Sequence, residues 1–185
     1  TDSLNRRSPL HEVSGRPSIC SAPMVSARRP AAKHVPVSIN SMDTPPWPAM
    51  GIGARAIVRD VRGLVLLIRR SAEVKWDPGL WELPGGKAEY GETIEHALVR
   101  EAREETGLAL EVGRPVHVSH FTKEPFWVTS VTFVCEAAGG DVRLSTEHDE
   151  FAWVELAHVI DRECTKPARE ALSAYQALVR SGEAV

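Results

Sequence analysis

Gly86 to Leu108 reads GKAEYGETIEHALVREAREETGL and follows directly on the turn Pro84-Gly85. From Thr93 to Thr106 the stretch contains no glycine or proline, and good helix formers dominate it. Gly91 precedes this segment and Gly107 follows it, which is the expected placement of glycines around a helix. The stretch therefore predicts a loop followed by a helix.

The predicted helix carries a stripe that changes from apolar to acidic along its length. At about 100° per residue, one face collects Ile94, Leu98, Glu101 and Glu105. Glu104 lies just off the edge of this stripe, and Arg100 points elsewhere and can pair with Glu104 at the i, i+4 spacing. We therefore expect the carboxylates to face the body of the protein.

A cluster of carboxylates on the inward face of the helix favours a metal site. Like charges raise one another's pKa unless a cation compensates. Oxygen ligands without a nearby cysteine or paired histidine favour Mg²⁺, with Mn²⁺ as the alternative, and Mg²⁺ commonly shares its sphere with substrate phosphates. The competing interpretation is a solvated acidic helix. The inward stripe and the glycine-rich turn before it favour the metal site, with a phosphate ester or anhydride as substrate.

The stretch Gly86–Leu108 resembles the signature box of the Nudix hydrolases, G-x5-E-x7-R-E-U-x-E-E-x-G-U, in which U is a bulky apolar residue. Every fixed letter of the box is present. One departure is Ala102, a small residue where Ile, Leu or Val is usual, and it affects packing under the helix but not the chemistry. The preceding segment Trp81–Lys87 resembles the turn before the box in MutT-like members.

This resemblance implies an α/β fold, a Nudix-type α/β/α sandwich with a mixed sheet, the box helix and a C-terminal helix. It implies a metal site whose ligands are the carboxylates of Glu101, Glu104 and Glu105 and the carbonyl of Gly86. Glu92 and Arg100 are then expected to brace the loop against the helix.

A second acidic segment contains a candidate catalytic base. On its own this segment is typical of an exposed acidic loop. In MutT-like relatives an acid in this loop, shortly before a tryptophan, completes the metal site or acts as the base. Glu147 has the best spacing for this role, and Asp149 and Glu150 are the next candidates. We interpret His148 as a surface residue, because Mg²⁺ prefers oxygen ligands.

Three further residues are candidates for binding substrate. Lys87 is either a phosphate contact or a solvated turn lysine, and Arg69 is either a strand end reaching into water or a phosphate contact. Trp127 either stacks on a base or belongs to the core.

Around the box, the hydrophobic pattern predicts mostly strands. A hairpin is expected from Ile52–Val58 and Leu64–Ile68, and a short strand at 81–83. Further strands are expected at 108–112, 116–121, 126–136 and 151–156, a helical turn at 157–160 and a last helix at 167–180.

Composition indicates one domain in a reducing compartment. The 185 residues with 43% hydrophobic content allow one substantial core. The net charge of −3 does not indicate a protein that binds nucleic acid through its overall charge. Three widely spaced cysteines argue against disulfides and zinc. No apolar run approaches the roughly 18 residues of a membrane span. We expect a cytoplasmic protein that contacts neither membrane nor nucleic acid.

Residues 1–48 differ from the rest. They are rich in Ser, Pro and Arg and lack a helical or strand period, which predicts a disordered leader before a Nudix domain at 49–182. An organellar transit peptide is the alternative, as is an artefactual segment with Met42 as the natural start.

The leading hypothesis is a Mg²⁺-dependent hydrolase that cleaves the pyrophosphate of a nucleoside di- or triphosphate derivative by water attack at phosphorus. The catalytic residues would be Glu101, Glu104, Glu105 and Glu147. The alternatives are a Nudix-fold nucleotide sensor without turnover and an isomerase acting on an isoprenyl diphosphate. Neither an ADP-ribose nor a diadenosine-polyphosphate specificity is indicated, and the oligomeric state is open between monomer and homodimer.

Overall fold

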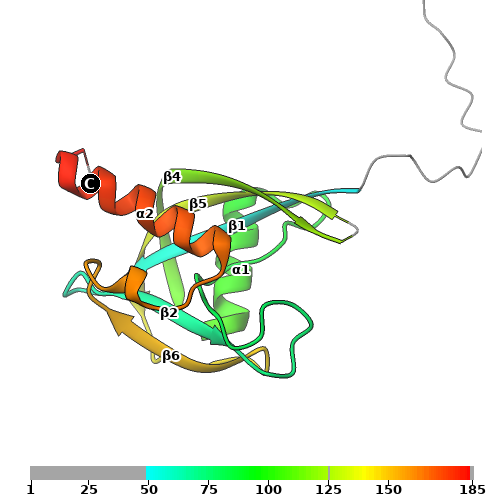
Figure 1. Cartoon of the computed structure of the whole chain (residues 1–185), viewed down its shortest axis with the longest axis horizontal. Coiled ribbons are helices and arrows are strands. Elements are labelled where there is room, and N and C mark those ends of the chain that lie inside the picture. The colour runs from blue at the N-terminus through cyan, green and yellow to red at the C-terminus, as the bar shows by residue number, and fades with distance from the viewer. Residues whose placement is uncertain (1–48, 125, 184–185) are drawn as a thin grey trace, which may run out of the picture. The chain divides into compact units, whose positions relative to one another are not determined.

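A curled mixed sheet forms the centre of the computed structural model, which describes residues 49–124 and 126–183 (Figure 1). Its strands are β1 (Ala49–Arg59), β2 (Val65–Arg70), β3 (Trp81–Glu82), β4 (Ala109–Lys123), β5 (Phe126–Gly139) and β6 (His148–Val154). The order across the sheet is β3-β2-β1-β5-β4, and β6 pairs with β2. β1 runs parallel to β5, whereas the other pairings are antiparallel.

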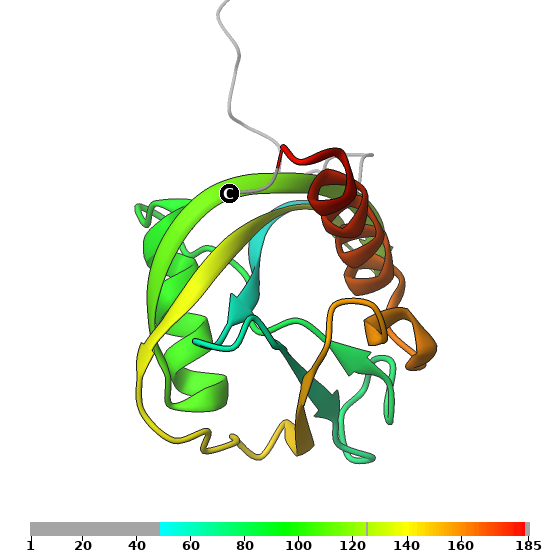
Figure 2. The same ribbon diagram turned by 90° about the vertical axis from the view of Figure 1, so that its left-hand side faces the viewer.

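Two helices cover the sheet. α1 (Ile94–Thr106) and α2 (Lys166–Ser181) lie on opposite sides of it, and the short 3-10 helix η1 (Val159–Asp161) comes before α2 (Figure 2). β1 contributes to both hydrophobic layers, because Ile57 packs in the layer that contains α2, while Ala56 and Val58 pack in the layer that contains α1. The predicted α/β/α sandwich with a mixed sheet is confirmed.

The boundaries of α1 follow from its capping residues. The Thr93 side chain accepts a hydrogen bond from the backbone N–H of His96 at 3.2 Å, which satisfies one free donor at the start of the helix. Gly107 ends the helix with φ of 73°, a left-handed conformation that favours glycine. The helix predicted from glycine placement is confirmed.

β4 differs from the sequence prediction. The strands expected at 108–112 and 116–121 form one continuous strand with β-bulges around Pro115. Proline lacks the N–H needed for regular pairing, but a bulge lets the strand continue past it. β4 therefore extends without a break to Lys123, close to Phe126, where β5 begins.

Some predictions lie partly or wholly outside the described range. The leader at 1–48 and Cys20 are outside it, so the leader stays a prediction. Cys135 and Cys164 are buried free thiols, and burial raises the pKa of Cys135 to about 12. None of the helices in the described residues is both long and apolar enough to cross a membrane.

Candidate active site

The turn at Gly85-Gly86 lies between β1 and the acidic half of α1. The backbone N–H of Ala54 donates to the Gly86 carbonyl at 2.9 Å, and a Cβ on Gly85 would lie 2.3 Å from the Ala54 carbonyl oxygen. A Cβ on Gly86 would lie 2.3 Å from the carboxyl carbon of Glu101. Glycine is needed at Gly85 because the chain passes so close to the backbone of β1, whereas at Gly86 a Cβ would displace the Glu101 carboxylate.

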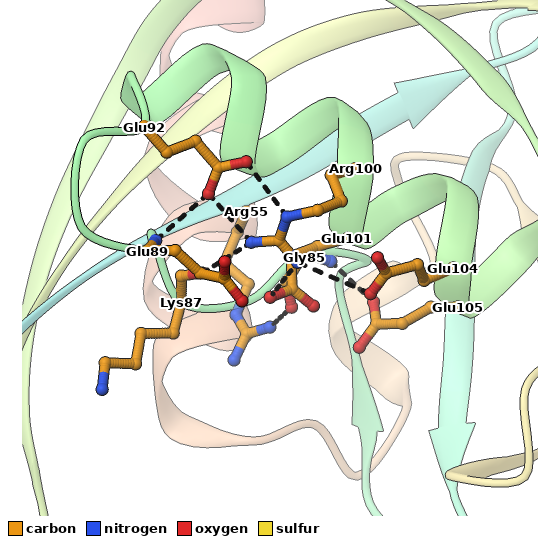
Figure 3. Close-up of polar contacts among 9 residues, drawn as sticks. All are labelled: Arg55, Gly85, Lys87, Glu89, Glu92, Arg100, Glu101, Glu104 and Glu105. Atoms are coloured by element: carbon orange, nitrogen blue, oxygen red, sulfur yellow. Dashed lines mark hydrogen bonds and ion pairs between the residues drawn. The ribbon is translucent and has the colours of Figure 1, made fainter.

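The three box glutamates differ in exposure. Glu105 is 8% exposed and accepts a hydrogen bond from the Gly85 N–H at 2.8 Å (Figure 3). Burial raises the pKa of Glu105 to about 7, although Arg55 and this hydrogen bond act in the opposite direction. Glu101 is partly buried, whereas the Glu104 side chain is 60% exposed. The prediction that the carboxylates face the body of the protein is therefore correct for Glu101 and Glu105 only.

Arg100 connects the helix to the loop before it. Its Nε and Nη2 donate to the two carboxylate oxygens of Glu92, both at 3.0 Å, and Nη2 also donates to the Lys87 carbonyl at 3.1 Å (Figure 3). Nη1 lies 3.0 Å from Glu101 and 3.5 Å from Glu104. The hydrogen bond from Arg100 lowers the pKa of Glu92. Arg100 thus joins the helix to the loop before it, and the predicted pair with Glu104 is its longest contact.

We expect Arg100→Lys to lower turnover by roughly 10- to 100-fold, because an ammonium cannot reproduce the paired hydrogen bonds that hold Glu92 and orient Glu101. Steady-state kinetics against Arg103→Lys, an exposed site on the same helix, would measure the effect. Equal activity of the two variants would contradict the bracing role.

A cleft of about 500 Å³ opens beside these residues. Among the candidates from sequence, its lining includes Lys87, Glu101, Glu105 and Glu147. The candidates that are not among its lining residues are Glu104, Arg69, Trp127, Glu92 and Arg100. The structure thus brings the proposed base, Glu147, to the same cleft as two of the box glutamates.

The neighbours of Glu147 have a different environment. Asp149 and Glu150 each lie 2.8 Å from the Arg69 guanidinium and form ion pairs with it. This pairing follows from the register of β2 and β6, which sets Arg69 opposite Glu150. Arg69 is therefore engaged outside the cleft, and of the three acids only Glu147 is among the cleft's lining residues.

Sequence reasoning missed a buried charge network under the cleft. Glu82 is 3% exposed and pairs with Arg70, with Arg55 at 3.7 Å and with His148 Nε2 at 3.1 Å. Burial alone would raise the pKa of Glu82, but Arg55, His148 and Arg70 together lower it to about 2. The interpretation of His148 as a surface residue is wrong: it is 4% exposed, and it lies at the start of β6 opposite Arg70 of β2, with its side chain against Glu82.

The residues of the cleft fit a hard divalent cation. Glu105 is a buried carboxylate with a raised pKa, Glu101 packs directly against Gly86, and the donors available there are oxygens. Glu82, Glu105 and His148 also offer ligand atoms that lie within 4.8 Å of one another. We assign these three residues to the charge network and not to a metal site, because the Glu82 carboxylate already forms ion pairs with two guanidiniums.

Comparison with known proteins agrees with the fold and with the box. Residues 50–176 match the family model described as the NUDIX domain. A MutT-like protein of Streptomyces ambofaciens is 34% identical over 119 residues, which cover 64% of this chain and 71% of that protein. The nucleoside triphosphatase NudI of Escherichia coli is 31% identical over 121 residues, which cover 60% of this chain and 86% of that protein. The solved structure of the MutT protein from Methanosarcina mazei Go1 superimposes with a TM-score of 0.65 at 28% identity. The match covers 74% of this chain and 98% of that one.

Proposed function

This chain belongs to the Nudix hydrolase family, and we propose that it hydrolyses a nucleoside triphosphate, or a related nucleoside diphosphate derivative such as an oxidised nucleotide, with Mg²⁺ or Mn²⁺ as cofactor. The observation that supports this is the charge distribution in one cleft. Its lining includes the acids Glu101, Glu105 and Glu147 and the cations Arg55 and Arg70. Such a site provides oxygen ligands for a cation and positive charges for the phosphates that the cation holds.

We propose Glu101, Glu104, Glu105 and the Gly86 carbonyl as the metal ligands. When bound, the cation supplies neutralisation of phosphate charge and acidification of water. Glu147 would accept the proton of the attacking water from its position in the cleft lining. Arg55 and Arg70, which Glu82 holds in place, would bind the phosphate oxygens.

An adjacent cavity offers space for the nucleoside. It has a volume of about 510 Å³, and its lining includes Trp76, Trp127 and Thr165. Aromatic side chains provide flat surfaces for a base, and a threonine hydroxyl offers a hydrogen bond to a base or sugar. The nucleoside is therefore proposed to bind here, with its phosphates extending toward the box glutamates, which gives Trp127 the stacking role considered from sequence.

A substrate panel with product identification tests the proposed function. The panel comprises nucleoside triphosphates, oxidised deoxynucleotides, ADP-ribose and dinucleoside polyphosphates, each with Mg²⁺, with Mn²⁺ and with EDTA. We expect hydrolysis of at least one nucleoside triphosphate with either metal and none with EDTA. Chromatography would identify the bond cleaved. Absence of turnover above the EDTA control across the panel would overturn the proposal.

A further inference from the structure

Lys123 lies where the two cavities meet. Both cavities are lined by a common group of residues, namely Arg55, Arg70, Trp76, Phe121 and Lys123. Glu101, Glu105 and Glu147 line only the cleft, whereas Trp127 and Thr165 line only the adjacent aromatic cavity. A molecule that reaches from the box glutamates into the aromatic cavity must therefore pass the shared residues.

Three of the shared residues are cations, namely Arg55, Arg70 and Lys123. Arg55 and Arg70 both pair with the single carboxylate of Glu82. Lys123 is half-buried, and no carboxylate of residues 49–124 and 126–183 forms an ion pair with it. Its ammonium lies 5.9 Å from the centre of the Trp76 ring. Burial, together with the charges of Arg70 and Arg55, lowers the pKa of Lys123.

Among these three cations, Lys123 has the most to gain from a bound anion. The guanidiniums already share a carboxylate, whereas the Lys123 ammonium is partly removed from water and forms no ion pair within residues 49–124 and 126–183. A charge-assisted hydrogen bond to phosphate would satisfy this ammonium. The same phosphate would be the one attached to the nucleoside, at the end of an anhydride that extends to the box glutamates.

We infer that Lys123 is a specificity-determining residue that binds the phosphate joining the nucleoside to the rest of the substrate. This inference rests on the proposed function, because it assumes that the substrate binds with its nucleoside in the aromatic cavity. The phosphate that Lys123 binds remains attached to the nucleoside in a nucleoside monophosphate product. Lys123 would therefore distinguish a nucleotide from the nucleoside that lacks its phosphate.

Binding measurements without turnover test this inference. Isothermal titration calorimetry in EDTA would give dissociation constants of the four 2′-deoxynucleoside 5′-monophosphates and their parent nucleosides. Wild type, Lys123→Met and Lys123→Arg would be compared with Lys75→Met. Lys75 is the matched control, since it is exposed, its ammonium lies 4.7 Å from the same Trp76 ring, and it lines the cleft of the box glutamates but not the aromatic cavity.

We expect Lys123→Met to weaken binding of the preferred monophosphate by roughly tenfold or more and to change nucleoside binding by about twofold at most, as for loss of one charge-assisted hydrogen bond. Lys123→Arg should retain most of the affinity, and Lys75→Met should resemble wild type. Unchanged monophosphate binding in Lys123→Met, an equal loss for the nucleoside, or wild-type binding that does not favour the monophosphate would each overturn the inference. Failure of the proposed function is a separate result, because it would appear as absence of hydrolysis by wild type.

Discussion

Glu105→Gln is expected to lower turnover by roughly a hundredfold or more while the domain stays folded. The substitution removes a charge directed at the metal and at the developing phosphate charge, and losses of this kind cost about 10² to 10³ in rate. The amide oxygen can still accept the hydrogen bond that the Gly85 N–H now donates to Glu105 at 2.8 Å. Turnover at saturating Mg²⁺ would be compared with Glu95→Gln, an exposed site in the first turn of the same helix.

The same variant has an expected signature in stability. Burial raises the pKa of Glu105 in the folded protein to about 7, above the 4.5 of an unperturbed glutamate. The contribution of Glu105 to stability is therefore fully present below pH 4.5 and is lost as pH rises through 7. Glutamine cannot ionise, so Glu105→Gln should be as stable as wild type near pH 4.5 and more stable near pH 8 without metal.

Thermal unfolding in EDTA at both pH values would measure this difference. A variant less stable than wild type at the higher pH would contradict the electrostatic account of Glu105. Near wild-type turnover at saturating Mg²⁺ would contradict its assignment as a metal ligand.

Glu147→Gln is expected to lower kcat by about 10² to 10⁴ with little change in KM, because help from a general base is expressed in the transition state. Glu147 lines the cleft together with Glu101 and Glu105. Asp149→Asn and Glu150→Gln serve as matched controls, since both acids pair with Arg69 at 2.8 Å. These two variants should stay within about threefold of wild type, as expected for partly exposed ion pairs.

The three variants would be measured between about pH 7 and 9. A silent Glu147→Gln beside an inactive Asp149→Asn or Glu150→Gln would transfer the role to that neighbour. Three silent variants would assign the base to a box glutamate.

Local features of the sequence were sufficient to predict the box helix and its loop. Thr93 and Gly107 act as caps within the helix's own neighbourhood, so their effect does not depend on distant parts of the chain. The apolar part of the stripe was also predictable, and Leu98 is fully buried. The acidic part was less predictable: the Glu104 side chain is 60% exposed, whereas Glu105, rotated by about 100° around the helix, is buried.

The polar residues around the cleft could not be located in the same way. Adjacent residues of a strand point to opposite faces, but a sequence alone does not say which face borders a cleft. Arg69 and Arg70 were therefore equivalent from sequence, although one pairs with Asp149 and Glu150 and the other lines the cleft. The role of Glu82 depends in the same way on side chains that other strands bring to it.

The sequence by itself determined the box helix with its caps and the identity of the box glutamates, because these depend on periodicity and spacing within a short segment, and the resemblance of that segment to the Nudix box implied the α/β fold. Only the tertiary structure decided which other charges surround the cleft. The register between β2 and β6 sets Arg69 opposite Glu150 and Arg70 opposite His148. A shift of one residue would reverse which side chains face the cleft, and that register is a long-range property, since it joins segments far apart in the chain.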